Sequence, residues 1–522
     1  MNFNSEIIVD KNNIKENEII NAYNIKILLP SKAIEFYKHG WQSWSLTCWI
    51  NVNRKQYYPP CPSIMNSVFM DPKYQNDKCP NGSWLGAVKC EDGQFFFLGG
   101  LNLNSRVRLS SLKVLEGIYD DDDNDDNNNN WFLNCSESEN ELFEKYTNHI
   151  KKYLNIKDKI NRNYNIWCSW YNFYDNINQD IILSSLVYLK DYNFDIFQID
   201  DGWQVKTGDW EPNGKFKNGM KYISESINKS NMIAGLWIAP LIAVESSELF
   251  INHKELFLRR SPNGEFVNAG FNWGEPLYAL DVTHPSTIIW LNNLILKLKL
   301  WNFKYIKLDF LYAGALPGYR YNQYISRELA YRKCLYSIQM ILGSDGYIDA
   351  CGAPILPSLG ICDALRIGPD VSKSWENKST RFLRNFASPC IKNAVRTTLN
   401  RYWLNSIIQV DPDVIYFHSI YNNLLINIAL LCNFNSTSDL PYNLSEEERN
   451  IFIAFLNNNI DNLNIKQIDH STFIINNNDK IDLSLPKYPK LYHRVILFFI
   501  NRICNIRFIF KFMNRIQYSL SH

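Results

Sequence analysis

The sequence has almost no excess of either charge. Its 54 Lys and Arg residues face 53 Asp and Glu residues, which gives a formal net charge of +1. This balance argues against nucleic acid as the main partner. The 12 cysteines are scattered and form no Cys-x-x-Cys pair. The segment that begins Met1-Asn-Phe-Asn has no basic stretch followed by an apolar run. We therefore expect free thiols and a cytoplasmic protein without a signal peptide.

Two further absences narrow the function. No pair of histidines has the spacing of metal ligands, so the sequence predicts no metal and no cofactor. The apolar stretch Leu491–Arg515 is interrupted too often by Arg and Lys to span a membrane. This stretch could lie on a membrane surface, pack as a terminal helix or strand pair, or be a degraded tail. We expect packing or degradation.

The length and apolar content indicate several domains with a large core. The chain has 522 residues, of which 46% are hydrophobic and 14% aromatic. Residues 1–160 are predicted to be β-rich, because short apolar runs such as Phe95–Gly100 alternate with Gly, Pro and Asn. The pattern changes at 161, where strand-like runs begin to alternate with helical stretches. The predicted division is 1–160, 161–460 and a short, atypical segment 461–522.

The middle part predicts a (β/α)₈ barrel. It contains eight strand-like runs, the number that such a barrel needs. The last two are the least regular of the set. The runs are 166–170, 194–200, 233–238, 305–309, 347–351, 364–367, 414–417 and a weak one near Asn433.

Two acidic residues stand at the ends of such runs. Asp309 ends Lys304-Tyr-Ile-Lys-Leu-Asp309, and Asp370 ends Cys362-Asp-Ala-Leu-Arg-Ile-Gly-Pro-Asp370. A carboxylate at the end of a buried strand is costly to desolvate, so it is rarely there without a role. Barrels of this type place catalytic groups at the carboxyl ends of their strands. Two carboxyl groups at one rim are what glycoside cleavage requires.

Other polar and aromatic side chains follow the same strand ends. Carboxylates can grip vicinal hydroxyls, Lys and Arg can donate to hydroxyls, and Trp can cover an apolar sugar face. Lys307 lies two residues before Asp309, so both side chains point to one face and the ammonium should keep Asp309 ionised. Asp411-Pro-Asp413 precedes the seventh run and is either part of the site or a simple turn. The remaining candidates are Trp170, Asp200, Asp201, Trp203, Trp237, Cys351 and Arg366.

Taken together, these motifs resemble glycoside hydrolase family 36, the α-galactosidases (melibiases) and their raffinose-synthase relatives in clan D. They run in the order of that family from about residue 40 to 440. The matching stretches are Gly40-Trp-Gln-Ser-Trp-Ser45, Trp167-Cys-Ser-Trp-Tyr171, Ile199-Asp-Asp-Gly-Trp203, Gly208-Asp-Trp210, Gly235-Leu-Trp-Ile-Ala-Pro240, Leu280-Asp-Val-Thr-His-Pro285, Tyr305-Ile-Lys-Leu-Asp309, Cys351-Gly-Ala-Pro354, Arg366-Ile-Gly-Pro-Asp370 and Asp411-Pro-Asp413.

The resemblance implies an N-terminal β-sandwich, a TIM-type barrel and a small C-terminal β-domain. It implies retaining hydrolysis of terminal α-galactosides, with Asp309 as the nucleophile and Asp370 as the acid/base. Asp200 and Asp201 match the grip on the 4- and 6-hydroxyls. By the same resemblance Trp237, Lys307, Cys351 and Arg366 line that subsite, and Trp41 lies near it.

The sequence leaves three other functions open. A raffinose-synthase-like galactosyl transferase would use the same covalent intermediate with a sugar as acceptor. An α-N-acetylgalactosaminidase would differ around the 2-position, which one sequence does not define. A decayed sugar-binding protein is suggested by the unusual C-terminal segment, whereas the intact Asp309 and Asp370 argue against decay. The sequence also leaves open whether the chain forms a homo-oligomer.

Overall fold

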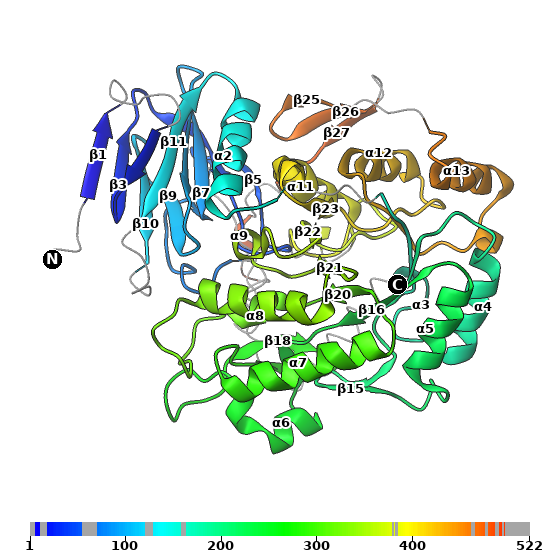
Figure 1. Cartoon of the computed structure of the whole chain (residues 1–522). Coiled ribbons are helices and arrows are strands. Elements are labelled where there is room, and N and C mark those ends of the chain that lie inside the picture. Colours follow the sequence, from blue (N-terminus) through cyan, green and yellow to red (C-terminus); the bar gives the residue numbers. More distant parts are fainter. Residues whose placement is uncertain are drawn as a thin grey trace.

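The structure is a computed structural model of the whole chain (Figure 1). It describes residues 6–10, 18–54, 70–120, 129–157, 163–377, 380–381, 385–460, 465–475, 479–485, 490–492 and 495. The predicted C-terminal tail, 491–522, lies almost entirely outside these residues. Within the part that is described, no helix is long and apolar enough to cross a membrane.

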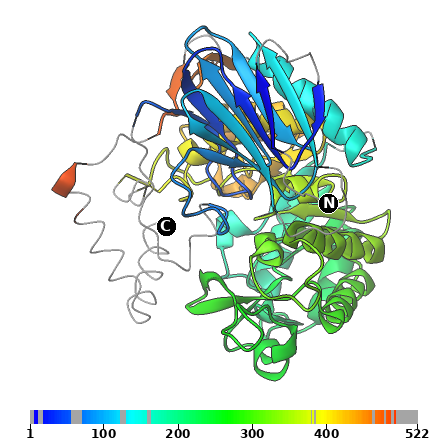
Figure 2. The ribbon, with the colours of Figure 1, turned by 90° about the vertical axis from the view of Figure 1, so that its left-hand side faces the viewer.

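The N-terminal part is β-rich, as predicted, and forms two sheets. The five-stranded sheet has the order β1 (Glu6–Asp10), β3 (Asn24–Leu28), β10 (Val114–Tyr119), β9 (Ser105–Ser111), β6 (Asn81–Ser83). The six-stranded sheet has the order β2 (Glu18–Asn21), β11 (Asn130–Ser136), β8 (Phe95–Gly100), β7 (Leu85–Cys90), β4 (Ala33–Lys38), β5 (Cys48–Asn51). Both lie at the left of the parallel sheet described below in Figure 1, and toward the viewer in Figure 2, which looks from that side.

Alternation along the strands explains how the six-stranded sheet is buried on both faces. Phe96 and Leu98 of β8 share one hydrophobic cluster with side chains of the five-stranded sheet, such as Ile25 and Val107. Phe97, between them, points to the other face and contacts the helix α2 (Glu139–Tyr153) through Tyr146, at 5.0 Å between ring centroids. Successive strand residues point to opposite faces, so one run of Phe residues serves two cores.

The middle of the chain forms a curled parallel sheet of eight strands, typical of the TIM-barrel type. All pairs between neighbouring strands are parallel. Ile415, which follows the last strand at one edge, also pairs in parallel with Thr437 at the other edge. The spatial order is β23 (Gln409–Asp411), β22 (Ala364–Arg366), β21 (Tyr347–Ala350), β20 (Tyr305–Leu308), β16 (Ile233–Ile238), β13 (Ile196–Ile199), β12 (Asn165–Cys168), β24 (Asn435–Thr437).

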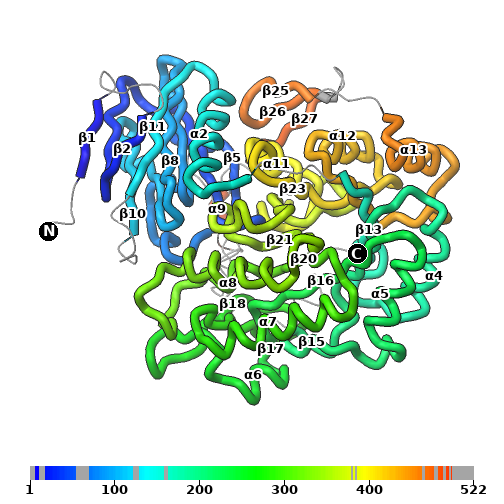
Figure 3. The backbone as a smooth tube through the Cα atoms, viewed as in Figure 1, coloured from blue at the N-terminus to red at the C-terminus, as the bar shows by residue number. Residues whose placement is uncertain are grey.

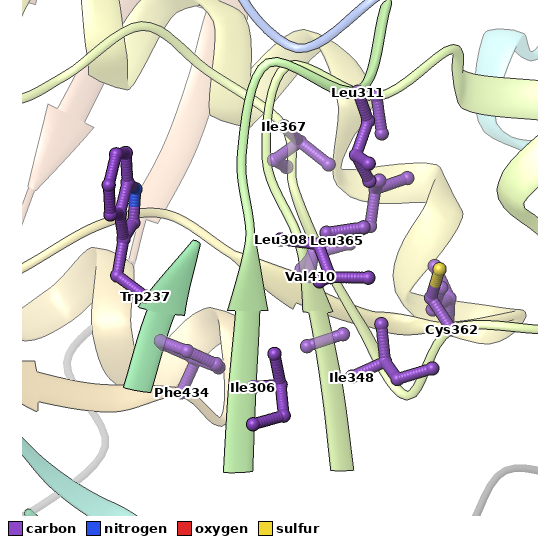
Figure 4. Close-up of a cluster of buried hydrophobic side chains, with 14 of the residues drawn as sticks. Trp237, Ile306, Leu308, Leu311, Ile348, Cys362, Leu365, Ile367, Val410 and Phe434 are labelled. Carbon is purple, nitrogen blue, oxygen red and sulfur yellow. The ribbon is translucent and has the colours of Figure 1, made fainter. Parts of the chain in front are cut away.

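Helices lie around this sheet and cover its outer face (Figure 3). Ile306 and Leu308 of β20, Ile348 of β21, Leu365 of β22 and Val410 of β23 gather in one apolar layer (Figure 4). The residues between them along the strands are polar. They point to the opposite face, because successive side chains of a strand alternate between its two faces. The helices are α4 (Gln179–Leu189), α5 (Gly219–Lys229), α7 (Pro285–Leu300), α8 (Arg327–Leu342), α11 (Ile391–Arg401), α12 (Asn422–Cys432) and α13 (Glu446–Leu456).

The seventh strand was predicted in the wrong place. The apolar run Val414–Phe417 is buried, but it makes only the single bridge at Ile415 among the described pairs, and the strand is β23 (Gln409–Asp411). Gln409 and Asp411 flank Val410, so two of the three strand residues are polar and the strand lacks an apolar run. The weak eighth run near Asn433 corresponds to β24, two residues later.

The N-terminal sheets are held to the parallel sheet by main-chain contacts around residues 40–45. The buried Arg401 donates to the carbonyls of Gly40, Gln42 and Ser43 and to that of Ile367, at 2.7–2.9 Å. Three loop carbonyls and that of Ile367, directly after β22, thus share one guanidinium, because each oxygen accepts a charge-assisted hydrogen bond. A bridge between Gln42 and Pro354 places the same loop beyond the carboxyl end of β21.

A small three-stranded sheet near the C-terminus contacts the N-terminal part. It consists of β25 (Ile465–Asp469), β26 (Thr472–Ile475) and β27 (Asp479–Asp482). His470, in the turn between β25 and β26, lies between Glu35 and Glu139, at 2.9 and 3.0 Å. Its ring stacks on Trp49 with 4.3 Å between centroids and 8° between planes.

Candidate active site

Asp309 lies directly after β20, with its carboxylate held at both oxygens. The Trp237 indole N–H donates to Oδ2 at 3.0 Å, and the Phe310 backbone N–H donates to Oδ1 at 2.7 Å. The residue is only 9% exposed. Burial raises its pKa, whereas the Lys307 charge and the two N–H donors oppose this rise. The result is an oriented carboxylate in a largely dry position, which suits a nucleophile.

Lys307 faces the same side as Asp309, but its direct partner is Asp200. Its Nζ lies 2.9 Å from Asp200 Oδ2, and both side chains are buried. Burial alone would lower the pKa of Lys307; the Asp200 charge outweighs it and holds the pKa well above the ordinary value. The ammonium acts on Asp309 through its charge, which lowers the pKa of Asp309 as predicted, although its direct ion pair is with Asp200. Gln198 Nε2 also donates to Asp200 Oδ2, at 2.8 Å.

Asp201, the neighbour of Asp200, is held by two other donors. Gln204 Nε2 donates to Oδ1 at 2.6 Å, and the Trp273 indole N–H donates to Oδ2 at 2.7 Å. The side chain is buried, and burial raises its pKa to about 6. Each oxygen keeps a lone pair for one further donor such as a hydroxyl.

Asp370 lies on the other side of the site and is tied to Arg366. The guanidinium donates from Nη1 to Asp370 Oδ1 at 3.0 Å, from Nε to Asp411 Oδ2 at 2.9 Å and from Nη2 to Asp413 Oδ1 at 2.7 Å. Arg366 is buried, whereas the Asp370 side chain is 36% exposed. Asp370 is thus held by Arg366 on one side and exposed to solvent on the other, where its carboxylate can contact a leaving group or water.

Asp413 is a buried carboxyl in this network. It accepts hydrogen bonds from the Tyr171 hydroxyl and from the Val371 backbone N–H. Burial raises its pKa to about 7, and the Asp370 and Asp411 charges add to the rise that Arg366 opposes. Asp411-Pro-Asp413 is therefore more than a turn, because both carboxylates bind the residue that anchors Asp370.

Cys351 and the 40–45 loop complete the rim. Cys351 is fully buried, and burial raises the pKa of its thiol well above the ordinary value, so the thiol stays protonated. Trp41 is also buried, 6.1 Å from Tyr312 between ring centroids. Trp44 of the same loop is partly exposed and reaches the Phe310 ring at 5.4 Å.

The remaining predicted tryptophans differ in exposure. Trp203 is fully buried and donates its indole N–H to the Trp237 carbonyl at 3.0 Å. Its contact with the site thus passes through Trp237. Trp170 opens the short helix α3 (Trp170–Phe173), is partly exposed, and packs edge-on against Tyr174 at 5.4 Å.

Beneath these residues the sheet encloses a cavity of about 10 Å³, enough for about one water molecule. Lys307 and Arg366 are the cations in its lining, and Asp349, Asp411 and Asp413 are its carboxyls. Within the described ranges, no group of three or more His, Cys, Asp or Glu side chains is arranged to hold a metal ion.

Comparison with known proteins matches this arrangement to one family. Residues 132–341 match the family model described as Melibiase. An α-galactosidase from Thermus thermophilus, solved in complex with p-nitrophenyl α-D-galactopyranoside, is 36% identical, with a TM-score of 0.79 over 90% of this chain and 94% of its own. Its structure with stachyose gives 37% identity and a TM-score of 0.76, over 84% of this chain and 93% of that chain.

The chain belongs to the melibiase family, glycoside hydrolase family 36. It is a glycoside hydrolase. A more distant likeness, to the family 36 α-galactosidase AgaA from Geobacillus stearothermophilus, concerns the fold alone: identity is 14% and the TM-score 0.56, over 84% of this chain and 62% of that chain.

In this melibiase-family site, the sequence did not predict Trp273, which contacts the predicted sugar-binding carboxylate of Asp201 directly. Trp273 lies 72 residues from Asp201 and comes from a hairpin outside the eight strands. The only signal for it was the turn-like Asn272-Trp-Gly274 between two short runs. Gln198 and Asp349 were not predicted either, although their strands were, because the predicted candidates are residues at or near the carboxyl ends of the strands and these two lie inside them.

Proposed function

We propose that this protein is a retaining α-galactosidase, which hydrolyses terminal α-D-galactosyl residues of oligosaccharides by double displacement. The observation that carries the proposal is the pair of differently held carboxylates: Asp309, buried and oriented by two N–H donors, and Asp370, anchored by Arg366 yet open to solvent. Support also comes from the Thermus thermophilus α-galactosidase, whose complexes contain an α-galactopyranoside and stachyose.

In the first step the Asp309 carboxylate attacks the anomeric carbon. The bond between that carbon and the glycosidic oxygen breaks, and Asp370 gives its proton to the departing oxygen. The product of this step is a β-galactosyl ester on Asp309. The ester removes the negative charge of Asp309 from the neighbourhood of Asp370, which suits the change of Asp370 from acid to base.

In the second step Asp370, now a carboxylate, takes a proton from water. Removal of this proton makes the water oxygen a stronger nucleophile. The oxygen attacks the anomeric carbon, and the ester bond to Asp309 breaks. Two inversions leave the product in the α-configuration. The 36% exposure of Asp370 supports this role, because water must reach its carboxylate.

The sugar binds in the part of the site that contains Lys307. Asp200 and Asp201 accept hydrogen bonds from the 4- and 6-hydroxyls, Lys307 donates to a ring hydroxyl, and the Trp237 indole covers an apolar face of the ring. Cys351 narrows the pocket. Trp170 and Trp41 are the other substrate-binding residues of this proposal. Arg366 acts through Asp370, and Trp203 acts through Trp237.

We propose the corresponding division of the chain into an N-terminal β-sandwich at 1–160, a (β/α)₈ barrel at 161–460 and a shortened C-terminal β-domain at 461–522. The hydrophobic cluster shared by the two N-terminal sheets supports the first unit. The Ile415–Thr437 pairing supports closure of the second.

One experiment tests the reaction. The protein is assayed on p-nitrophenyl α-galactopyranoside and on the corresponding N-acetylgalactosaminide, and the anomer released first is identified by proton NMR. We expect turnover of the galactoside with α-galactose as the first product. A first product in the β-configuration would contradict retention, and preference for the N-acetyl sugar would contradict the assigned substrate. Transfer to an added sugar in place of water would identify the galactosyl transferase instead.

A further inference from the structure

A hairpin outside the eight-stranded sheet reaches into the site. Strands β18 (Asn268–Asn272) and β19 (Glu275–Ala279) pair antiparallel, and Asn272 faces Glu275 across a two-residue turn. The turn residues, Trp273 and Gly274, have φ of +49° and +78°. A type I′ turn needs positive φ at both positions, and a bulky side chain seldom adopts it. A tryptophan in this position indicates a requirement for its side chain.

The hairpin is fixed both beside its turn and toward its open end. Both Glu275 oxygens accept from Ser246, one from the hydroxyl at 2.7 Å and one from the backbone N–H at 2.9 Å. On the other strand, the Ala269 carbonyl accepts from the hydroxyl of Tyr312, in the segment that follows Asp309. These contacts connect the position of the tip to the segments around the site.

At the tip the Trp273 ring lies between two residues already placed at the site. Its centroid is 6.2 Å from that of Trp237 and 5.6 Å from that of Phe310. Its indole N–H donates to Asp201 Oδ2 at 2.7 Å. The residue is partly exposed, so it is not a core side chain.

We propose that Trp273 is a positioning residue for sugar recognition: its indole N–H fixes the Asp201 carboxylate so that the free lone pairs face one hydroxyl of the galactosyl ring. This inference rests on the proposed function. Trp273 and Gln204 occupy one lone pair on each Asp201 oxygen, so the orientation of the other two is determined. The same N–H also lowers the pKa of Asp201 against the effect of burial, which keeps the carboxylate ionised at neutral pH.

The test compares three variants with the unchanged protein. Trp273→Phe keeps an aromatic ring and removes the N–H. Trp273→His restores a ring N–H donor, and His tolerates positive φ better than most residues. Trp290→Phe is the matched control, because it makes the same change in another partly buried tryptophan, on α7. Melting temperatures are recorded for all of them, so that a folding defect is seen directly.

Each protein is assayed on p-nitrophenyl α-galactopyranoside and on its 4-deoxy and 6-deoxy analogues. Asp201→Asn first identifies which hydroxyl Asp201 binds, because the analogue without that hydroxyl is the least affected by the change. We expect Trp273→Phe to lower kcat/KM on the galactoside by about 10- to 100-fold, the range for one hydrogen bond to a charged group. The loss should nearly vanish on the same analogue that Asp201→Asn identified.

Two further results are expected. Trp273→His should recover part of the lost kcat/KM, and the acid limb of the Trp273→Phe pH profile should move to higher pH, because removal of the donor raises the pKa of Asp201. An equal loss on all three substrates, or no loss relative to Trp290→Phe, would overturn the role of Trp273. Absence of turnover by the unchanged protein would overturn the proposed function as well, so the two failures are distinguishable.

Discussion

Replacement of Asp349 by Asn should stabilise the protein, although Asp349 is a buried residue among charged groups. Asp349 is only 2% exposed and lines the cavity beneath the site. The Tyr305 hydroxyl donates to Oδ2 at 2.9 Å, while Oδ1 has no hydrogen-bond partner among the described residues. Burial, and then the Asp411 charge, raise its pKa to about 7, against the opposing charges of Lys307 and Arg366.

The sign of the effect follows from proton linkage. Between pH of about 4 and 7, folded Asp349 keeps a proton that the unfolded chain has released, so the free energy of unfolding falls as the pH rises through this window. The pKa moves from 3.8 to about 7, roughly three pH units, and at 1.36 kcal/mol per unit the loss is about 4 kcal/mol. Above pH of about 7 the loss is complete and constant. An asparagine resembles the protonated carboxyl in shape and avoids this loss.

The assay is the difference in thermal and urea unfolding between Asp349→Asn and the unchanged protein, measured from pH 4 to pH 8. We expect a difference near zero at pH 4 that grows in favour of the variant up to pH of about 7. Asp345→Asn, an exposed residue on the segment that enters β21, is the matched control and should show no such trend. A variant that is less stable at every pH, or by a constant amount, would refute the reasoning, because Asp349 would then be ionised and needed as an anion.

Three further predictions concern the two carboxylates and the C-terminal sheet. Asp309→Ala should abolish turnover, and azide should restore it on an activated substrate with a β-galactosyl azide as product; substantial activity without azide would contradict the assignment. Asp370→Asn should slow substrates with poor leaving groups far more than those with good ones, so an equal loss across a leaving-group series would count against it. Burial lowers the pKa of His470, but its hydrogen bonds to Glu139 and Glu35 outweigh this and raise it to about 9. His470→Gln should therefore cost about 3 kcal/mol below pH of about 6.5, where the ion pairs contribute fully, and the difference should disappear as the pH rises through 9; a difference independent of pH would exclude the ion pairs as its source.

The parts of the site that sequence reasoning found share a local signature. Lys307 and Asp309 alternate with Ile306 and Leu308, so one run contains both the apolar outer layer and the polar inner face. Such a run predicts its own strand and the direction of its polar side chains. Arg366 alternates with Leu365 in the same way, so its strand and the face to which its side chain points are also predictable from the sequence.

The parts that it missed depend on tertiary contacts or on polar strands. Strand β23 has polar residues on both sides of Val410: Gln409 donates to the carbonyls of Cys432 and Asn433, and Asp411 binds Arg366, so the apolar pattern favours the run after it. Trp273 belongs to a hairpin whose distance from Asp201 is set by the anchor contacts of Glu275 and by the whole curvature of the sheet. The pairing of Lys307 with Asp200 is also tertiary, since Asp309 was the nearer charged neighbour in the sequence.

The two buried cations of the candidate site have different partners, which correspond to different tasks in the proposed mechanism. Lys307 pairs with Asp200, which we propose binds a sugar hydroxyl, and Arg366 holds Asp370, which we propose protonates the leaving group. Asp309 lies between them and takes its orientation from the neutral donors of Trp237 and Phe310. A nucleophile that is not itself locked in an ion pair keeps its lone pairs available for the anomeric carbon. In the proposed mechanism, the carboxylates for sugar binding and proton transfer are thus paired directly with a cation, whereas the proposed nucleophile is held only by neutral N–H donors.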